Sequence, residues 1–138
     1  MKTSQNFNIY IITSDELYGQ TLKDFLKTKL DDTIMVQLFT TVQSCINEMG
    51  SWEIKPDMII LDYSLNETFK NNTNGLDAIE HIKNISPDTM ISIISDKNEM
   101  DTAIKTLRFA DCNFVNKDQF LFSHLLNSIQ ECLQPAKL

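Results

Sequence analysis

Three residues of complementary chemistry stand at the ends of apolar runs in this chain: Asp62, Ser95 and Lys117. A carboxylate can accept a phosphoryl group, a hydroxyl can donate a hydrogen bond to one of its oxygens, and an ammonium can balance its charge. Each residue type alone is common in the loop that follows a strand. Their succession at the ends of three separate runs is more specific, and it favours a site that handles a phosphoryl group.

The apolar runs before these residues are short and bounded by turn formers, as in Met58–Leu61, which Pro56 and Asp57 precede. Such a run is typical of a strand buried on both faces of a parallel sheet. The carboxyl ends of parallel strands share one edge of the sheet, which is where open α/β sheets bind ligands. We therefore expect the three residues to converge on one crevice.

Strand and helix patterns alternate along the chain without a repeat, a linker or a low-complexity segment. The expected strands cover residues 7–12, 34–39, 58–62, 90–94 and 112–116, and the expected helices lie within residues 15–30, 42–49, 76–85, 100–107 and 120–133. This alternation implies parallel strands joined by right-handed crossovers. The sequence therefore predicts an α/β fold, a doubly wound five-stranded parallel sheet with helices on both faces.

Apolar spacing indicates the first and last of these helices. The apolar positions are Leu17, Leu22, Phe25, Leu26 and Leu30 in the first, and Phe120, Leu121, Leu125, Leu126, Ile129 and Leu133 in the last. Both series recur at roughly helical spacing, so each predicts a helix, the last of them amphipathic.

Composition is typical of one globular domain, with 138 residues of which 42% are hydrophobic and 22% charged. The net charge of −7 and the pI near 4.7 argue against direct binding to nucleic acid, which needs a basic surface. No apolar run approaches the roughly 20 residues of a membrane span, and the N-terminus carries no secretory signal. We therefore expect a cytoplasmic protein that does not contact the membrane.

Cysteine and histidine residues indicate neither a disulfide framework nor a metal centre. Cys45, Cys112 and Cys132 are odd in number and far apart, and they do not have the spacing of a zinc knuckle. His81 and His124 lie in expected helices without a second ligand at metal spacing. We interpret all five as structural or solvated residues.

Four short motifs resemble those of the receiver domain of bacterial two-component response regulators, the CheY-like fold. They are Ile60-Leu61-Asp62, Gly75-Leu76-Asp77, Ile93-Ile94-Ser95 and Phe114-Val115-Asn116-Lys117. The resemblance covers essentially the entire chain. It implies a single receiver domain over residues 1–138, with a core of about residues 7–134 and the flavodoxin-like strand order 2-1-3-4-5.

The resemblance also implies a role for each site residue. Asp62 would accept a phosphoryl group from a histidine kinase or a phosphotransfer protein, with the help of magnesium. Ser95 would be the switch hydroxyl, Lys117 would contact the phosphoryl group, and Ser64 would offer its main-chain carbonyl to the metal. Such a domain is not an enzyme beyond self-catalysed phosphotransfer and dephosphorylation.

The residues after the first strand depart from the family pattern, because Thr13 and Ser14 stand where the family usually carries an acidic pair. Magnesium prefers several oxygen ligands, anionic ones above all, so the loss of two carboxylates should weaken its binding. Asp15 is the first carboxylate after this strand and could partly substitute. We therefore expect at most a weak Mg²⁺ site formed by Asp62, Asp15 and Ser64.

The function that these observations favour is a phosphorylation-dependent or atypical switch that binds a downstream protein. Its expected partner surface comprises the fourth helix, the fifth strand and the fifth helix, around Lys105, Arg108, Phe109, Phe114 and Phe122. The main alternative is a pseudo-receiver that binds its partner constitutively, without phosphorylation.

Two further alternatives are an enzyme and a cofactor-binding protein. A hydrolase of the haloacid dehalogenase type also uses a strand-end aspartate, but it needs a second aspartate at the position of Ser64. A flavodoxin needs a phosphate-binding Ser/Thr/Gly loop after the first strand, and this chain lacks one. Both are disfavoured.

Overall fold

The computed structural model describes residues 7–51, 55–63, 75–96, 104 and 112–133. The strands are β1 (Phe7–Ile12), β2 (Ile34–Phe39), β3 (Met58–Asp62), β4 (Met90–Ser95) and β5 (Asn113–Asn116), and the helices are α1 (Glu16–Lys29), α2 (Val42–Ser51), α3 (Gly75–Ile85) and α5 (Leu121–Leu133). The helix expected at residues 100–107 lies outside the described residues except for Ile104.

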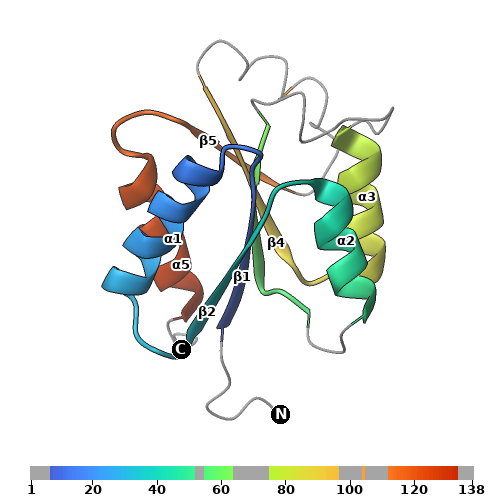
Figure 1. Ribbon diagram of the computed structural model, residues 1–138, viewed down its shortest axis with the longest axis horizontal. Coiled ribbons are helices and arrows are strands. Elements are labelled where there is room, and N and C mark those ends of the chain that lie inside the picture. Colours follow the sequence, from blue (N-terminus) through green and yellow to red (C-terminus); the bar gives the residue numbers. More distant parts are fainter. Residues whose placement is uncertain (1–6, 52–54, 64–74, 97–103, 105–111, 134–138) are drawn as a thin grey trace, which may run out of the picture.

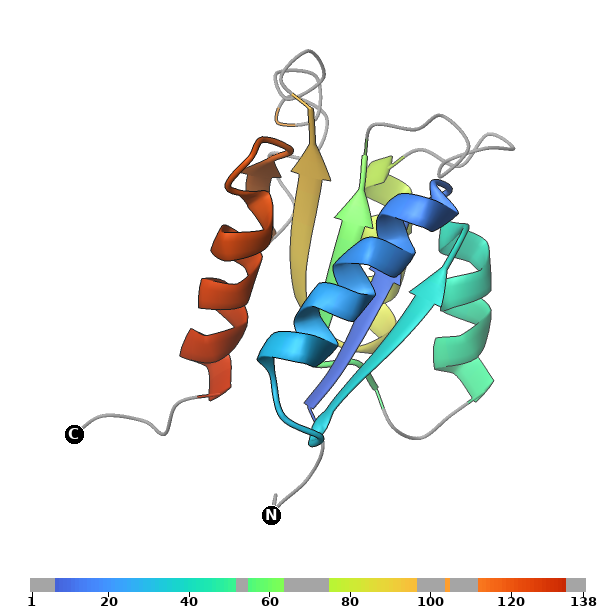
Figure 2. The ribbon, with the colours of Figure 1, turned by 60° about the vertical axis from the view of Figure 1, so that its left-hand side comes forward.

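The strands form one parallel sheet in the order β2-β1-β3-β4-β5, which confirms the predicted fold. Helices α1 and α5 cover one face of the sheet, and α2 and α3 cover the other (Figure 1). The register pairs Asp62 with Ile94 and Ser95 with Asn116. The strands point the same way, so their carboxyl ends meet at one edge (Figure 2).

Strand β3 is buried along its whole length, as its unbroken apolar sequence predicts. Met58 and Ile60 face a core shared with α1 and α5, whereas Ile59 and Leu61 face a core shared with α2 and α3. We call these the α1–α5 core and the α2–α3 core. Because side chains alternate along a strand, one short run supplies apolar surface to both cores and carries Asp62 to its carboxyl end.

Helix α1 is capped by Asp15, whose Oδ1 accepts a hydrogen bond from the Tyr18 main-chain N at 3.0 Å. Leu17 belongs to the helix, as its spacing predicts, but it does not lie on the buried face, since its side chain is 79% exposed. The buried Leu22 follows Leu17 by five positions, so the two side chains point in directions about 140° apart around the helix axis. Tyr18, four residues before Leu22, packs against the α1–α5 core instead.

A glycine brings α1 close to the strand ends. A Cβ at Gly19 would lie 2.5 Å from Leu38 Cδ1 and 2.9 Å from Thr13 Cγ2, closer than two carbon atoms can approach without displacement. The first turns of α1 therefore lie against the carboxyl ends of β1 and β2 at a distance that a larger side chain would prevent.

Helix α5 begins one residue later than its apolar pattern predicts. Phe120, which the pattern placed on this helix, precedes it and is 54% exposed, and Leu133 at its last position is 41% exposed. The Phe120 main-chain N donates to Asp118 Oδ1 at 2.8 Å, which shapes the turn into the helix.

In the described part of the chain, no helix has the length and apolar character required to cross a membrane.

Candidate functional site at the carboxyl edge of the sheet

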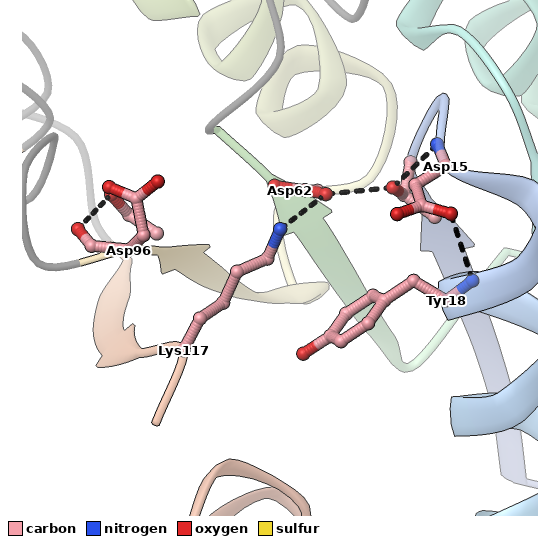
Figure 3. A network of polar contacts seen from close by, with 7 residues as sticks. Asp15, Tyr18, Asp62, Asp96 and Lys117 are labelled. Carbon is pink, nitrogen blue, oxygen red and sulfur yellow. Dashed lines mark hydrogen bonds and ion pairs between the residues drawn. The ribbon is translucent and has the colours of Figure 1, made fainter. Parts of the chain in front are cut away.

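Asp62, the last residue of β3, lies between a residue that follows the adjacent strand β1 and a residue that follows β5, beyond β4. Thr13, directly after β1, donates a hydrogen bond from Oγ1 to Asp62 Oδ2 at 2.7 Å. Lys117, directly after β5, places its Nζ 2.8 Å from the same oxygen (Figure 3). One carboxylate oxygen thus accepts from a hydroxyl and from an ammonium.

Burial makes these two contacts energetically important. The Asp62 side chain is 0% exposed and that of Lys117 is 18% exposed. A carboxylate removed from water is stable only when hydrogen bonds and an opposite charge replace its hydration. The Lys117 main-chain N donates to the Ser95 carbonyl at 2.8 Å, which fixes the lysine beside β4 and within reach of Asp62.

The Thr13 hydroxyl is oriented by its own neighbours. The Thr13 main-chain N donates to the Phe39 carbonyl at 2.9 Å, and Oγ1 accepts from the Asp15 main-chain N at 3.1 Å. Because that N–H already points at Oγ1, the hydroxyl proton is free to point at Asp62. The sequence indicated Thr13 only as a missing carboxylate; its burial at 0% exposure marks it as a direct partner of the site.

Ser95 reaches the same edge of the sheet, but its hydroxyl has another partner. Its Oγ donates to the Asp96 main-chain carbonyl at 3.1 Å, and the side chain is buried. In Figure 3 Asp96 lies apart from Asp62, on the other side of the lysine from Asp15. In this conformation the serine proton is therefore directed to its own chain.

The described residues offer few anionic ligands to a magnesium ion. Such an ion would screen the negative charge of acceptor and donor, and it favours several anionic oxygen ligands. Asp15 caps α1 with its carboxylate, Thr13 is neutral, and Lys117 already compensates Asp62. Within the described ranges, no three His, Cys, Asp or Glu side chains lie together as a metal site, and Ser64 is outside those ranges.

An aromatic ring covers the lysine, which the sequence pattern did not suggest. The Tyr18 ring centroid lies 4.7 Å from Lys117 Nζ, within the range of a cation–π contact. Burial, followed by the negative charges of Asp62 and Asp15, raises the pKa of the Tyr18 phenol to about 12. The one available signal in the sequence was the four-residue spacing from Tyr18 to Leu22.

The expected partner surface is described only in part, because Lys105, Arg108 and Phe109 lie outside the described residues. Phe114 and Phe122 are both half-buried, but they pack on opposite faces of the sheet. Phe114 lies against the α2–α3 core and Phe122 against the α1–α5 core.

Comparison with known proteins relates the chain to one family. The response regulator receiver domain family matches residues 9–130. The response regulator domain of Thermotoga maritima CheB is similar in structure, with 18% identity, a TM-score of 0.68, and coverage of 95% of this chain and 100% of that chain. A CheY-like receiver domain protein from Methanospirillum hungatei has 16% identity, a TM-score of 0.71 and 94% coverage of both chains.

A longer regulator shows the same fold in one part. The response regulator DrrB, a Thermotoga maritima OmpR/PhoB homologue, has 20% identity and a TM-score of 0.67, and the match covers 94% of this chain but 53% of DrrB. At these identities the similarity shows the fold. No curated protein sequence matches the chain significantly.

Proposed function

Because this chain belongs to the family of response regulator receiver domains, we propose that it serves two-component signalling as a protein-interaction module whose Asp62 centre is held without a metal ion. A histidine kinase or a phosphotransfer protein would be its upstream partner. A downstream protein would bind the surface of β5, α5 and the chain before β5. The chain would act through these contacts and not as an autonomous enzyme.

One observation carries this proposal: Thr13 and Lys117 bind the same oxygen of the buried Asp62. In place of the family's acidic pair, the chain supplies a hydroxyl that donates to the acceptor carboxylate. A carboxylate compensated in this way is a weaker nucleophile than a free one. An incoming phosphoryl group is itself anionic, and Lys117 already balances Asp62.

The second candidate is a switch controlled by phosphorylation of Asp62, which the presence of Asp62, Ser95 and Lys117 at one edge favours. The N–P bond of a phosphohistidine would break, a bond from an Asp62 oxygen to phosphorus would form, and the imidazole would leave with the electron pair. Ser95 would then exchange the Asp96 carbonyl for a phosphoryl oxygen.

Intact mass spectrometry after incubation with acetyl phosphate and Mg²⁺ tests the choice. We expect the wild-type chain to gain little phosphoryl mass, and a double variant Thr13→Asp and Ser14→Asp to gain clearly more. Asp62→Asn in the double variant should abolish the gain. Stoichiometric phosphorylation of the wild-type chain, lost in Asp62→Asn, would favour the switch over the metal-free module.

Amide chemical shifts during a Mg²⁺ titration supply a second measurement. The double variant should bind Mg²⁺ on the order of tenfold more tightly than the wild-type chain, because the site gains two anionic ligands. Saturation of the wild-type chain at submillimolar Mg²⁺, with shifts centred on Asp62, would contradict the proposal.

A further inference from the structure

A row of three aromatic rings leads from the Asp62 site into the seam between α1 and α5. The Tyr18 and Phe122 ring centroids are 6.0 Å apart, and those of Phe122 and Phe25 are 5.1 Å apart. Both pairs are tilted, with interplanar angles of 60° and 45°. These distances lie within the range in which aromatic pairs attract one another. The row begins at Lys117, through its contact with Tyr18.

We propose that Tyr18 is a positioning residue, whose ring holds the Lys117 ammonium against Asp62 and couples this ion pair through Phe122 to the α1–α5 seam. The inference goes beyond the proposed function, because it requires neither a metal ion nor a phosphoryl group. The Tyr18 ring would help to hold the charged pair of Asp62 and Lys117, and a change in the charge of Asp62 would alter the surroundings of Phe122.

The geometry restricts Lys117 from two directions. Its Nζ lies 2.8 Å from Asp62 Oδ2 and 4.7 Å from the Tyr18 ring centroid. A lysine side chain has four rotatable bonds, and holding it in one conformation costs considerable entropy. A ring face favours the conformers that keep the ammonium near the carboxylate, and its attraction for a cation is stronger where water is largely excluded.

The Tyr18 ring is itself fixed. Its main-chain N donates to the capping carboxylate of Asp15, and its side chain packs on the α1–α5 core. A tyrosine phenol is neutral at physiological pH, and burial, followed by the charges of Asp62 and Asp15, raises the pKa of this one further, to about 12. A neutral ring attracts Lys117 through its face without competing with Asp62 as an anion.

A second lysine at the far end of the row provides a built-in comparison. Lys29 Nζ lies 6.0 Å from the Phe25 ring centroid, and Lys29 is exposed. Lys29 lies in the last turn of α1. Lys117 is thus a cation held between a ring and a buried carboxylate, whereas Lys29 is a cation near a ring in water.

The test measures hydrogen exchange of the Lys117 ammonium by NMR in the full chain, with Lys29 as the exposed reference. Tyr18→Phe retains the ring face and should leave the Lys117 exchange rate within about twofold of wild type, whereas Tyr18→Leu should raise it about fivefold or more. Tyr18→Met, with a longer apolar chain, provides a second variant without a ring if Tyr18→Leu does not fold.

Phe25→Leu is the matched control. It weakens the same core at the other end of the row but leaves Tyr18 in place, so Lys117 exchange should not change. An unchanged rate in Tyr18→Leu or Tyr18→Met, or an equal rise in Phe25→Leu, would overturn the positioning role.

The coupling to the seam is tested with Asp62→Asn. This change should shift the Phe122 ring signals in the wild-type background and leave them nearly unaffected when Tyr18 is Leu or Met. A Phe122 response of the same size with and without the Tyr18 ring would overturn the coupling.

Discussion

The two ends of β3 each carry an aspartate, and the two are held in different ways. Asp57, just before the strand, accepts from the Asn8 main-chain N at 2.8 Å and donates its own N–H to the Asn8 carbonyl at 2.8 Å. Asp62, at the other end, accepts from the side chains of Thr13 and Lys117. Main-chain donors are fixed by the fold, whereas side-chain donors can rotate or be substituted. The carboxyl end can therefore change its state without disturbing the sheet.

The lysines near the two ends differ in the group that accepts from them. Lys83 Nζ donates to the Thr89 carbonyl at 2.6 Å near the amino end, whereas Lys117 contacts a buried carboxylate at the carboxyl end. A carbonyl is neutral and can accept from water after the lysine is lost. A buried carboxylate has no such replacement, so the two ends should respond unequally to equivalent substitutions.

Loss of the site lysine should have the largest effect. Lys117→Met leaves the buried Asp62 without the ammonium and should lower the free energy of unfolding by about 3 kcal/mol. Lys83→Met, the matched change near the amino end, should cost about 1 kcal/mol. Urea unfolding followed by circular dichroism measures both, and equal losses would remove the distinction between the two ends.

Loss of the threonine hydroxyl should have the next largest effect. Thr13→Val preserves the shape of the side chain but removes the donor to Asp62, and it should lower the free energy of unfolding by about 2 kcal/mol. Thr13→Ser keeps the hydroxyl, loses one buried methyl group and should cost about 1 kcal/mol. If Thr13→Ser were the more damaging change in urea unfolding, packing and not the hydrogen bond would be the main role of Thr13.

A glycine in each of two helices tests the close approach of α1. Gly19→Ala introduces a Cβ that would clash with Leu38 and Thr13, and it should destabilise the chain by about 1 kcal/mol net of its helix-propensity gain. Gly50→Ala, at the end of α2, meets nothing within 4 Å and should be stabilising by about 0.5 kcal/mol. Opposite signs in thermal unfolding are the expected result; a neutral Gly19→Ala would show that α1 can move away.

Conversion of the amino-end aspartate to asparagine should have the smallest effect. Asp57→Asn retains an oxygen that can accept from the Asn8 N–H, so the free energy of unfolding should change by only about 0.5 kcal/mol. Its amide oxygen replaces the carboxylate without losing the main-chain contact. Asp62→Asn should shift the Lys117 side-chain NMR signals, whereas Asp57→Asn should not. A Lys117 response to Asp57→Asn would show that the two ends are not independent.

The sheet could be predicted from the sequence because each strand carries its own signal. The unbroken run at 58–61 and the alternation of strand and helix patterns were sufficient to predict parallel strands, whose carboxyl ends bring Asp62 and Lys117 to one edge. The order of the strands was implied by the family resemblance. Main-chain positions depend on periodicity and topology, so they can be predicted from the sequence.

Side-chain partners could not be predicted in the same way. The hydroxyl direction of Thr13 depends on the Asp15 N–H, and that of Ser95 on the Asp96 carbonyl, both of which are three-dimensional relations. Leu17 is the more apolar of two adjacent residues, but its position around the helix turns it away from the sheet, and Tyr18 packs on the core. Hydrophobicity alone does not fix the phase of a helix when neighbouring residues are both apolar.

The setting of Thr13 has a consequence for substitution at this position. Its main chain is fixed to Phe39, and its Oγ1 accepts from Asp15, a contact that an aspartate side chain at position 13 could also make. An acidic residue could therefore be accommodated there without rebuilding the backbone. Such a substitution would place a second carboxylate beside Asp62, and their repulsion would favour retention only where a cation is available to relieve it. One substitution at position 13 would thus turn a centre compensated by Lys117 into one that also calls for a cation.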